Sequence, residues 1–82
     1  MITAPDRIPL RHGFAMRDLD RLARRALLMD RWPVADADER HDAVLHAITI
    51  AVLTADERPH PRDLVRLGLR ASNRHVEQEL RH

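Results

Sequence analysis

Two breaks marked by proline divide this 82-residue chain and constrain its fold more than any other feature. The first is Trp32-Pro33, because the residue before a proline is pushed out of the helical region. The second is DERPHP at residues 56–61, whose final proline suits the first position of a new helix. The segments between the breaks are long enough for helices, and the whole chain is short enough to form only one domain.

Apolar residues recur at helical spacing in all three segments. They are Leu19, Leu22, Ala23, Ala26 and Leu27 in the first segment, and Leu64, Leu67, Ala71, Val76 and Leu80, interrupted by Gly68, in the third. The second segment is apolar around nearly its whole circumference from Ala47 onward, which favours the middle of a bundle or contact with a partner. Its β-branched residues between 48 and 52 are compatible with a strand, but its length, its alanines and the lack of a second strand favour a helix.

We therefore expect an all-α protein. Residues 1–15, which contain Pro5, Pro9 and Gly13, are expected to form an irregular N-terminal lead-in. Residues 16–82 are expected to form a small three-helix bundle, with helices at about 16–32, 37–55 and 61–81. Either Asp36 or Asp38 could cap the second helix.

The composition excludes several classes of protein. Because the chain has no cysteine, it can form neither disulfides nor cysteine-based zinc sites. Its first ten residues lack the apolar core of a secretory signal. Its longest mostly apolar run, residues 47–53, is far shorter than the roughly 20 residues that span a membrane. We therefore expect a cytoplasmic protein that does not contact a membrane.

Charge is distributed unevenly, with an acidic middle between two basic flanks. The sharpest feature is a stripe of arginines at successive i,i+4 positions of the third segment, namely Arg62, Arg66, Arg70 and Arg74. Like charges at this spacing destabilise a helix, so something should offset them. One candidate is external, either nucleic-acid phosphates or an acidic protein. The other is internal, the acidic side chains of Asp36, Asp38, Glu39 and Asp42. A third alternative is that the stripe is merely solvated and binds nothing.

No pattern of catalytic or metal-binding residues is strong. Asp38, Asp42 and His46 share a helix face, as do His75 and Glu79, but nothing in the sequence brings three or four ligands together. Ser72 and His75 lack an orienting acid and an oxyanion site. A bundle of this size also has little room for a substrate cleft. We expect no enzyme activity, no metal or other cofactor and no small-molecule substrate, and we interpret Trp32 as a plug at one end of the bundle rather than a base-stacking residue.

Two segments resemble a known family. Residues 41–55, beginning His41-Asp42-Ala43-Val44, resemble the polymerase-binding helix of sigma-70-type transcription factors, and residues 64–81 resemble the helix that follows it. The wider pattern over residues 16–82 is similar to the region-2-type helical domain of sigma-like proteins from actinobacteria, their phages and mobile elements. A helix-turn-helix across residues 63–80 is a second template, which fits less well because Val76 falls out of register.

The sigma resemblance implies two surfaces. The second helix would dock on RNA polymerase through Asp38, His41, Asp42, Leu45 and Thr49, and the third would face promoter DNA through Arg62, Arg66, Arg70, Asn73 and Arg74. This chain departs from the family in having no aromatic residue from position 56 to 82, so we do not expect it to melt promoters. Our hypothesis is a transcription-related module that binds RNA polymerase, DNA or both. The alternative is a non-enzymatic interaction domain that forms a homodimer through its apolar second helix.

Overall fold

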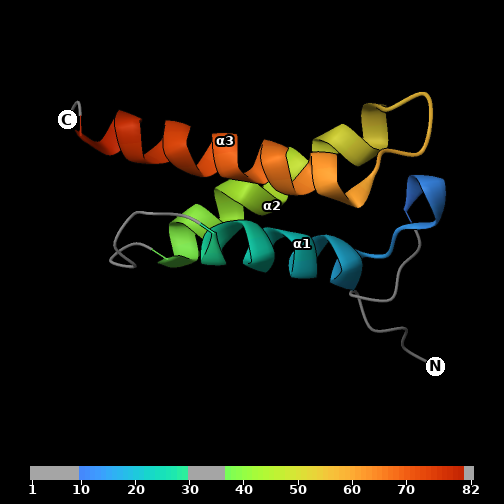
Figure 1. The fold of residues 1–82 in the computed structure, drawn as a ribbon, viewed down its shortest axis with the longest axis horizontal. Helices are drawn as coiled ribbons and strands as arrows, with labels where there is room; N and C mark the ends of the chain where they lie inside the picture. Colours follow the sequence, from blue (N-terminus) through green and yellow to red (C-terminus); the bar gives the residue numbers. More distant parts are fainter. Residues whose placement is uncertain (1–9, 30–36, 81–82) are drawn as a thin grey trace.

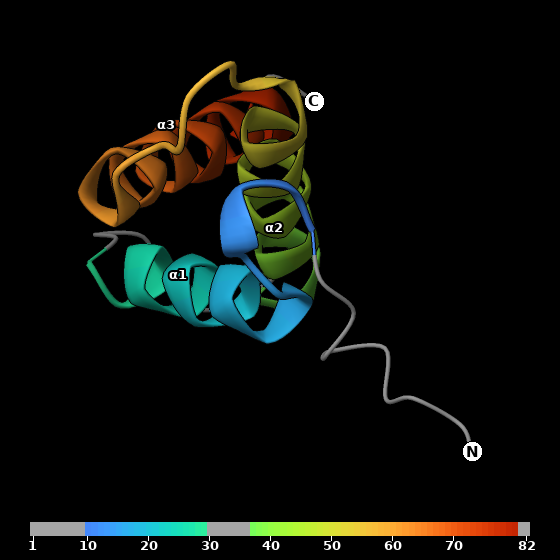
Figure 2. The ribbon, with the colours of Figure 1, turned by 90° about the vertical axis from the view of Figure 1, so that its right-hand side faces the viewer.

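The computed structural model describes residues 10–29 and 37–80, and it confirms an all-α bundle with a short irregular N-terminal region. A 3₁₀ turn, η2 (Arg11–Gly13), precedes helices α1 (Met16–Leu28), α2 (Ala37–Thr54) and α3 (Pro61–Leu80) (Figure 1). Each α-helix contacts the other two. Helices α1 and α3 lie side by side, and α2 packs against one side of this pair (Figure 2). Within the described ranges, no helix has both the length and the apolar character needed to cross a membrane.

Helix α1 begins at a side-chain cap and ends earlier than the sequence suggests. The backbone N–H of Ala15 donates to Asp18 Oδ2 at 2.8 Å, which satisfies a donor at the start of the helix. We predict an end near residue 32, but the helix ends at Leu28 and Met29 forms its C-cap. Leu28 is 87% exposed and Met29 60% exposed. Packing is what chiefly stabilises helices in proteins, and these two side chains have little of it, which accounts for the earlier end.

Of the residues predicted to mark the boundary between α1 and α2, only some lie in the described structure. Trp32, Pro33 and Asp36 lie outside the described residues, so the break, the plug and one candidate cap are not seen. Asp38, the other candidate cap, lies inside the first turn of α2. There its carboxylate favours the helix through the dipole.

All three helices meet at Gly68, which is buried in α3. A Cβ atom built on Gly68 would lie 2.9 Å from Val44 Cγ1, 3.0 Å from Ala26 Cβ and 3.2 Å from Ile48 Cδ1. These distances leave no space for a side chain. Gly68 interrupts the apolar face of α3 in the sequence, and it therefore allows α1 and α2 to approach α3 closely.

Helix α2 uses its apolar circumference in two ways. Val44, Ile48 and Val52 are fully buried against α1 and α3. On the remaining surface, Ile50 is 46% exposed and Leu53 is 42% exposed. The pattern predicts either a central helix or contact with a partner, and within this chain α2 has both a buried face and an uncovered apolar one.

The residues just before α1 are held against the connection between α2 and α3. Phe14 is 4% exposed and belongs to the core, and the guanidinium of Arg58 lies 4.5 Å from the centre of its ring. Arg11 Nη1 donates to the backbone oxygen of Leu53 at 2.7 Å, and His12 Nε2 donates to that of Ala55 at 2.8 Å. The end of the irregular lead-in thus caps one end of the bundle.

Candidate nucleic-acid interface

The arginine stripe lies on the exposed surface of α3. All four arginines, at positions 62, 66, 70 and 74, are exposed. At about 1.5 Å of rise per residue they extend over roughly 18 Å. Because each i,i+4 step also turns by about 40°, the stripe winds around α3 by about 120° from Arg62 to Arg74. Asn73 is exposed on the same helix.

One acidic side chain lies near the stripe. Asp63 Oδ1 is 4.0 Å from Arg66 Nη1, and both side chains are more than 60% exposed, so this contact is weak. Among the side chains that the structure describes, no other carboxylate lies within 4.0 Å of a stripe arginine. The acids of α2 point elsewhere: Glu39 lies 3.9 Å from His75 and Asp42 lies 3.9 Å from His41. In the described structure, Asp38, Glu39 and Asp42 therefore do not neutralise the stripe.

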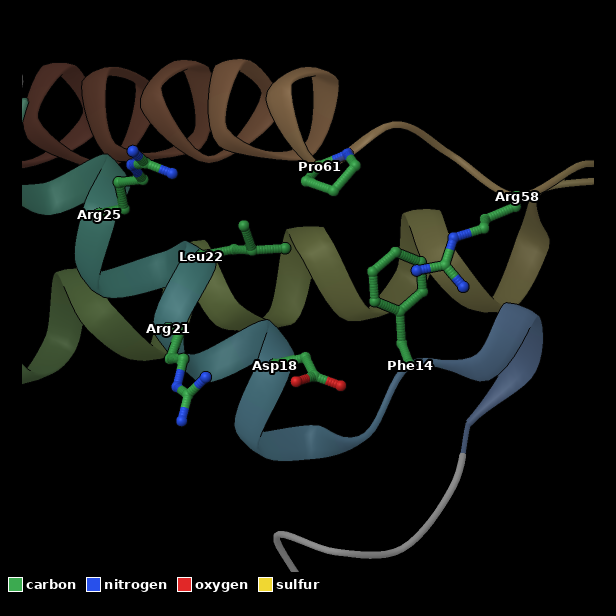
Figure 3. A pocket seen from close by; sticks show the side chains of 7 residues that line it. All are labelled: Phe14, Asp18, Arg21, Leu22, Arg25, Arg58 and Pro61. Atoms are coloured by element: carbon green, nitrogen blue, oxygen red, sulfur yellow. The ribbon is translucent and has the colours of Figure 1, made fainter.

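A groove runs between α1 and the first half of α3. Its volume is about 530 Å³, and it is lined by Leu22, Arg25, Met29, His60, Pro61, Arg62, Val65, Arg66 and Leu69. A neighbouring hollow of about 370 Å³ shares Leu22, Arg25 and Pro61 with it and reaches Arg58 (Figure 3). In this view Arg25 lies between α1 and α3, whereas Arg21 points away from α3. From the length of the chain we expect little room for a cleft, so this groove is a feature that sequence reasoning misses.

The groove divides the stripe into two pairs. Arg62 and Arg66 line it together with Arg25 of α1, whereas Arg70 and Arg74 lie farther along α3 and outside it. Sequence reasoning does not find Arg25, because it lies on a different helix from the stripe. The only signal available is its position beside the apolar stripe of α1, which places it at the edge of a packed face.

The residues that the sigma resemblance assigns to polymerase docking differ in their exposure along α2. His41 Nε2 lies 2.8 Å from Asp20 Oδ1, so this side chain faces α1. Leu45 packs against the core, and the Thr49 hydroxyl donates to the backbone oxygen of Leu45 at 2.7 Å. Asp38 and Asp42 are the two members of the set that are exposed. His41, Leu45 and Thr49 are partly buried.

The described sequence candidates do not assemble into a metal site. In the described part of the chain, no three His, Asp or Glu side chains come close enough to hold a metal ion. Ser72 is fully buried, while His75 is half-buried and faces Glu39. Helix α3 is continuous from Pro61 to Leu80, so residues 63–80 contain no turn between two helices. The helix-turn-helix interpretation is therefore wrong.

Comparisons of the chain with protein-family models, with curated proteins and with solved structures give no match. What the surface can bind therefore has to follow from its chemistry. That chemistry is four exposed guanidinium groups along one helix, with a fifth, from Arg25, across a groove.

Proposed function

We propose that this protein binds nucleic acid through the arginine stripe of α3 and acts as a sigma-like module in transcription. The observation that carries the proposal is that all four arginines are exposed. Among the described side chains, one carboxylate lies within 4.0 Å of them, that of Asp63, and its contact with Arg66 is weak. Repulsion among like charges on α3 costs a few tenths of a kcal/mol per pair. Phosphate groups would remove this cost, and their released counterions would drive binding.

The stripe is suited to phosphates more than to bases. Guanidinium groups form bidentate hydrogen bonds with phosphate oxygens, and this recognition is largely independent of sequence. Residues 56–82 contain no Phe, Tyr or Trp, the side chains on which proteins stack unpaired bases. We therefore expect the protein to bind a duplex at least as tightly as a single strand.

The polymerase part of the proposal rests on the sigma resemblance. RNA polymerase core is the protein partner that the resemblance supplies. Asp38 and Asp42 are the exposed residues of α2 through which contact would occur. A pull-down of RNA polymerase core by the wild-type chain, compared with the Asp38→Arg/Asp42→Arg variant, tests this part separately from DNA binding. Equal capture by both chains would contradict it.

A titration of labelled DNA tests the nucleic-acid part. Fluorescence anisotropy would follow binding to duplex and single-stranded DNA of equal length at several salt concentrations. For three or four phosphate contacts, the logarithm of the duplex association constant should fall with the logarithm of salt concentration at a slope of about −3. The variant Arg70→Glu/Arg74→Glu should bind at least about tenfold more weakly, and its slope should be smaller in magnitude by about 2.

The matched control is Arg17→Glu/Arg21→Glu, which makes the same charge change at the same spacing on exposed positions of α1. This variant should lose less than about threefold in affinity, because screening weakens the effect of charges that do not contact the ligand. An equal loss in both variants would show a general charge effect and overturn the assignment to α3. The absence of binding at low salt would overturn nucleic-acid binding altogether.

A second candidate function, homodimerisation, is favoured by the exposure of Ile50 and Leu53 on α2. Burial of apolar surface is worth about 25 cal/mol per Å², so pairing these side chains would stabilise a dimer. Sedimentation equilibrium would then show a dimer that Ile50→Glu converts to a monomer and that Arg66→Glu/Arg70→Glu leaves intact. A wild-type chain that remains monomeric at high concentration would exclude this candidate.

A further inference from the structure

The groove between α1 and α3 has an apolar floor. Leu22 of α1 and Met29, which caps the C-terminus of α1, line one side of it, while Val65 and Leu69 of α3 line the other. Met29 is 60% exposed, and Leu28, next to it, is 87% exposed. Apolar side chains gathered in one exposed groove are typical of a surface that a partner covers.

The position of the groove suits another helix. Helix α2 packs against one side of the α1–α3 pair, and none of the described helices covers the opposite side (Figures 1 and 2). A helix laid between α1 and α3 on that side would complete a four-helix arrangement, in which each helix packs against two neighbours. Its apolar side chains would occupy the space of about 530 Å³ between Leu22 and Leu69.

The charges around the groove specify what kind of helix fits. Arg25 on α1 and Arg62 and Arg66 on α3 line it beside the apolar floor. The nearby carboxylate of Asp63 is 69% exposed and lies 4.0 Å from Arg66. We propose that this groove binds an amphipathic helix of a partner protein, with an apolar stripe facing the floor and Asp or Glu residues on both sides of the stripe. Charge complementarity of this kind fixes orientation and speeds association.

This site goes beyond nucleic-acid binding, because the apolar floor of the groove makes no favourable contact with DNA. A phosphate backbone offers no apolar group to cover Met29 and Leu69, whereas an amphipathic helix does. The two ligands would nevertheless share Arg62 and Arg66. Bound acidic helix should therefore compete with DNA, so a partner that carries such a helix would regulate DNA binding.

The test uses a synthetic helical peptide of about 20 residues, roughly 30 Å long. It carries Leu at i, i+3, i+4 and i+7 positions and Glu at the flanking positions, and a control peptide has Lys in place of every Glu. Fluorescence anisotropy of the labelled peptides should show that the Glu peptide binds at least about tenfold more tightly than the Lys peptide. In a competition titration, the Glu peptide should also displace labelled duplex from the wild-type chain.

Variants of the protein separate this proposal from nucleic-acid binding. Met29→Glu and Arg25→Glu change exposed residues of the groove outside α3. Each should lower the affinity for the Glu peptide at least about tenfold. Arg70→Glu/Arg74→Glu should leave the affinity for the Glu peptide unchanged and lower only the affinity for DNA. Circular dichroism would confirm that each variant keeps its helices.

Three outcomes would overturn the proposal. The first is equal binding of the Glu and Lys peptides. The second is a Glu-peptide affinity that neither Met29→Glu nor Arg25→Glu changes. The third is a wild-type dimer that Met29→Glu dissociates while the Glu peptide does not bind, because a second copy of the chain would then be the occupant of the groove.

Discussion

Helix α1 packs against α2 on one side and α3 on the other, and we call these two contacts the α1–α2 seam and the α1–α3 seam. The two seams differ in whether their charged side chains have partners within the fold. On the side of α2, Asp20 Oδ2 lies 2.9 Å from Arg24 Nε, and Asp20 Oδ1 lies 2.8 Å from His41 Nε2, so one carboxylate lies between basic groups of two helices. On the side of α3, Arg25 lines a groove with Arg62 and Arg66, and the exposed carboxylate of Asp63 lies 4.0 Å from Arg66. The α1–α2 seam uses its charges within the fold, whereas the α1–α3 seam leaves them at the surface.

This difference separates residues that stabilise the bundle from residues that are available to a ligand. A charged group with a partner inside the fold contributes to the free energy of unfolding, and its removal lowers that free energy. A charged group without one contributes little to stability, so its removal should change only binding. Measurements of stability and of binding on the same variants can therefore test the comparison.

The largest effect is expected where both seams meet the core, at Gly68. In Gly68→Val the new Cβ would lie 3.0 Å from the Cβ of Ala26, which cannot rotate away, and 2.9 Å from Val44 Cγ1. Overpacking of this kind should lower the free energy of unfolding by roughly 3 kcal/mol. Urea denaturation followed by circular dichroism would measure it. The control Gln78→Val, on the exposed surface of the same helix, should cost less than about 1 kcal/mol, and similar losses in both variants would show that Gly68 is not a packing constraint.

A smaller effect is expected at the α1–α2 seam. Asp20→Asn keeps the shape of the side chain but removes the charge that Arg24 and His41 share, so the free energy of unfolding should fall by about 1 kcal/mol. The same exchange at Asp42, which is 86% exposed and 3.9 Å from the other side of the His41 ring, should change it by less than about 0.3 kcal/mol. Thermal unfolding of both variants at neutral pH would compare them. Equal changes would mean that the Asp20 contacts do not hold α1 to α2.

The smallest effect on stability is expected at the α1–α3 seam. Arg25→Gln/Arg62→Gln should change the free energy of unfolding by less than about 0.5 kcal/mol, because neither guanidinium has a carboxylate within ion-pairing distance in the described structure. The same variant should lose affinity for the Glu peptide. A loss of stability above about 1 kcal/mol in urea denaturation would contradict the comparison, since it would show that these arginines are neutralised within the fold.

The local pattern determines much of this protein by itself. Three helices are predicted by the apolar spacing that ends in Ala26 and Leu27, the proline at position 61 and the alanines of the second segment. The described residues form three α-helices. The i,i+4 spacing from Arg62 to Arg74 predicts a stripe, and all four side chains are exposed. These features are predictable because helical geometry depends on residues three or four positions apart.

Only the tertiary structure decides which side chains meet. The end of α1 at Leu28, the need for glycine at position 68 and the approach of Asp20 to His41 depend on which helix packs where. The same is true of the groove, because Arg25 and Arg66 are far apart in the sequence and share a site only when α1 lies beside α3. Spacing along one helix specifies the face on which a residue lies, but it carries no information about what another helix brings to that face.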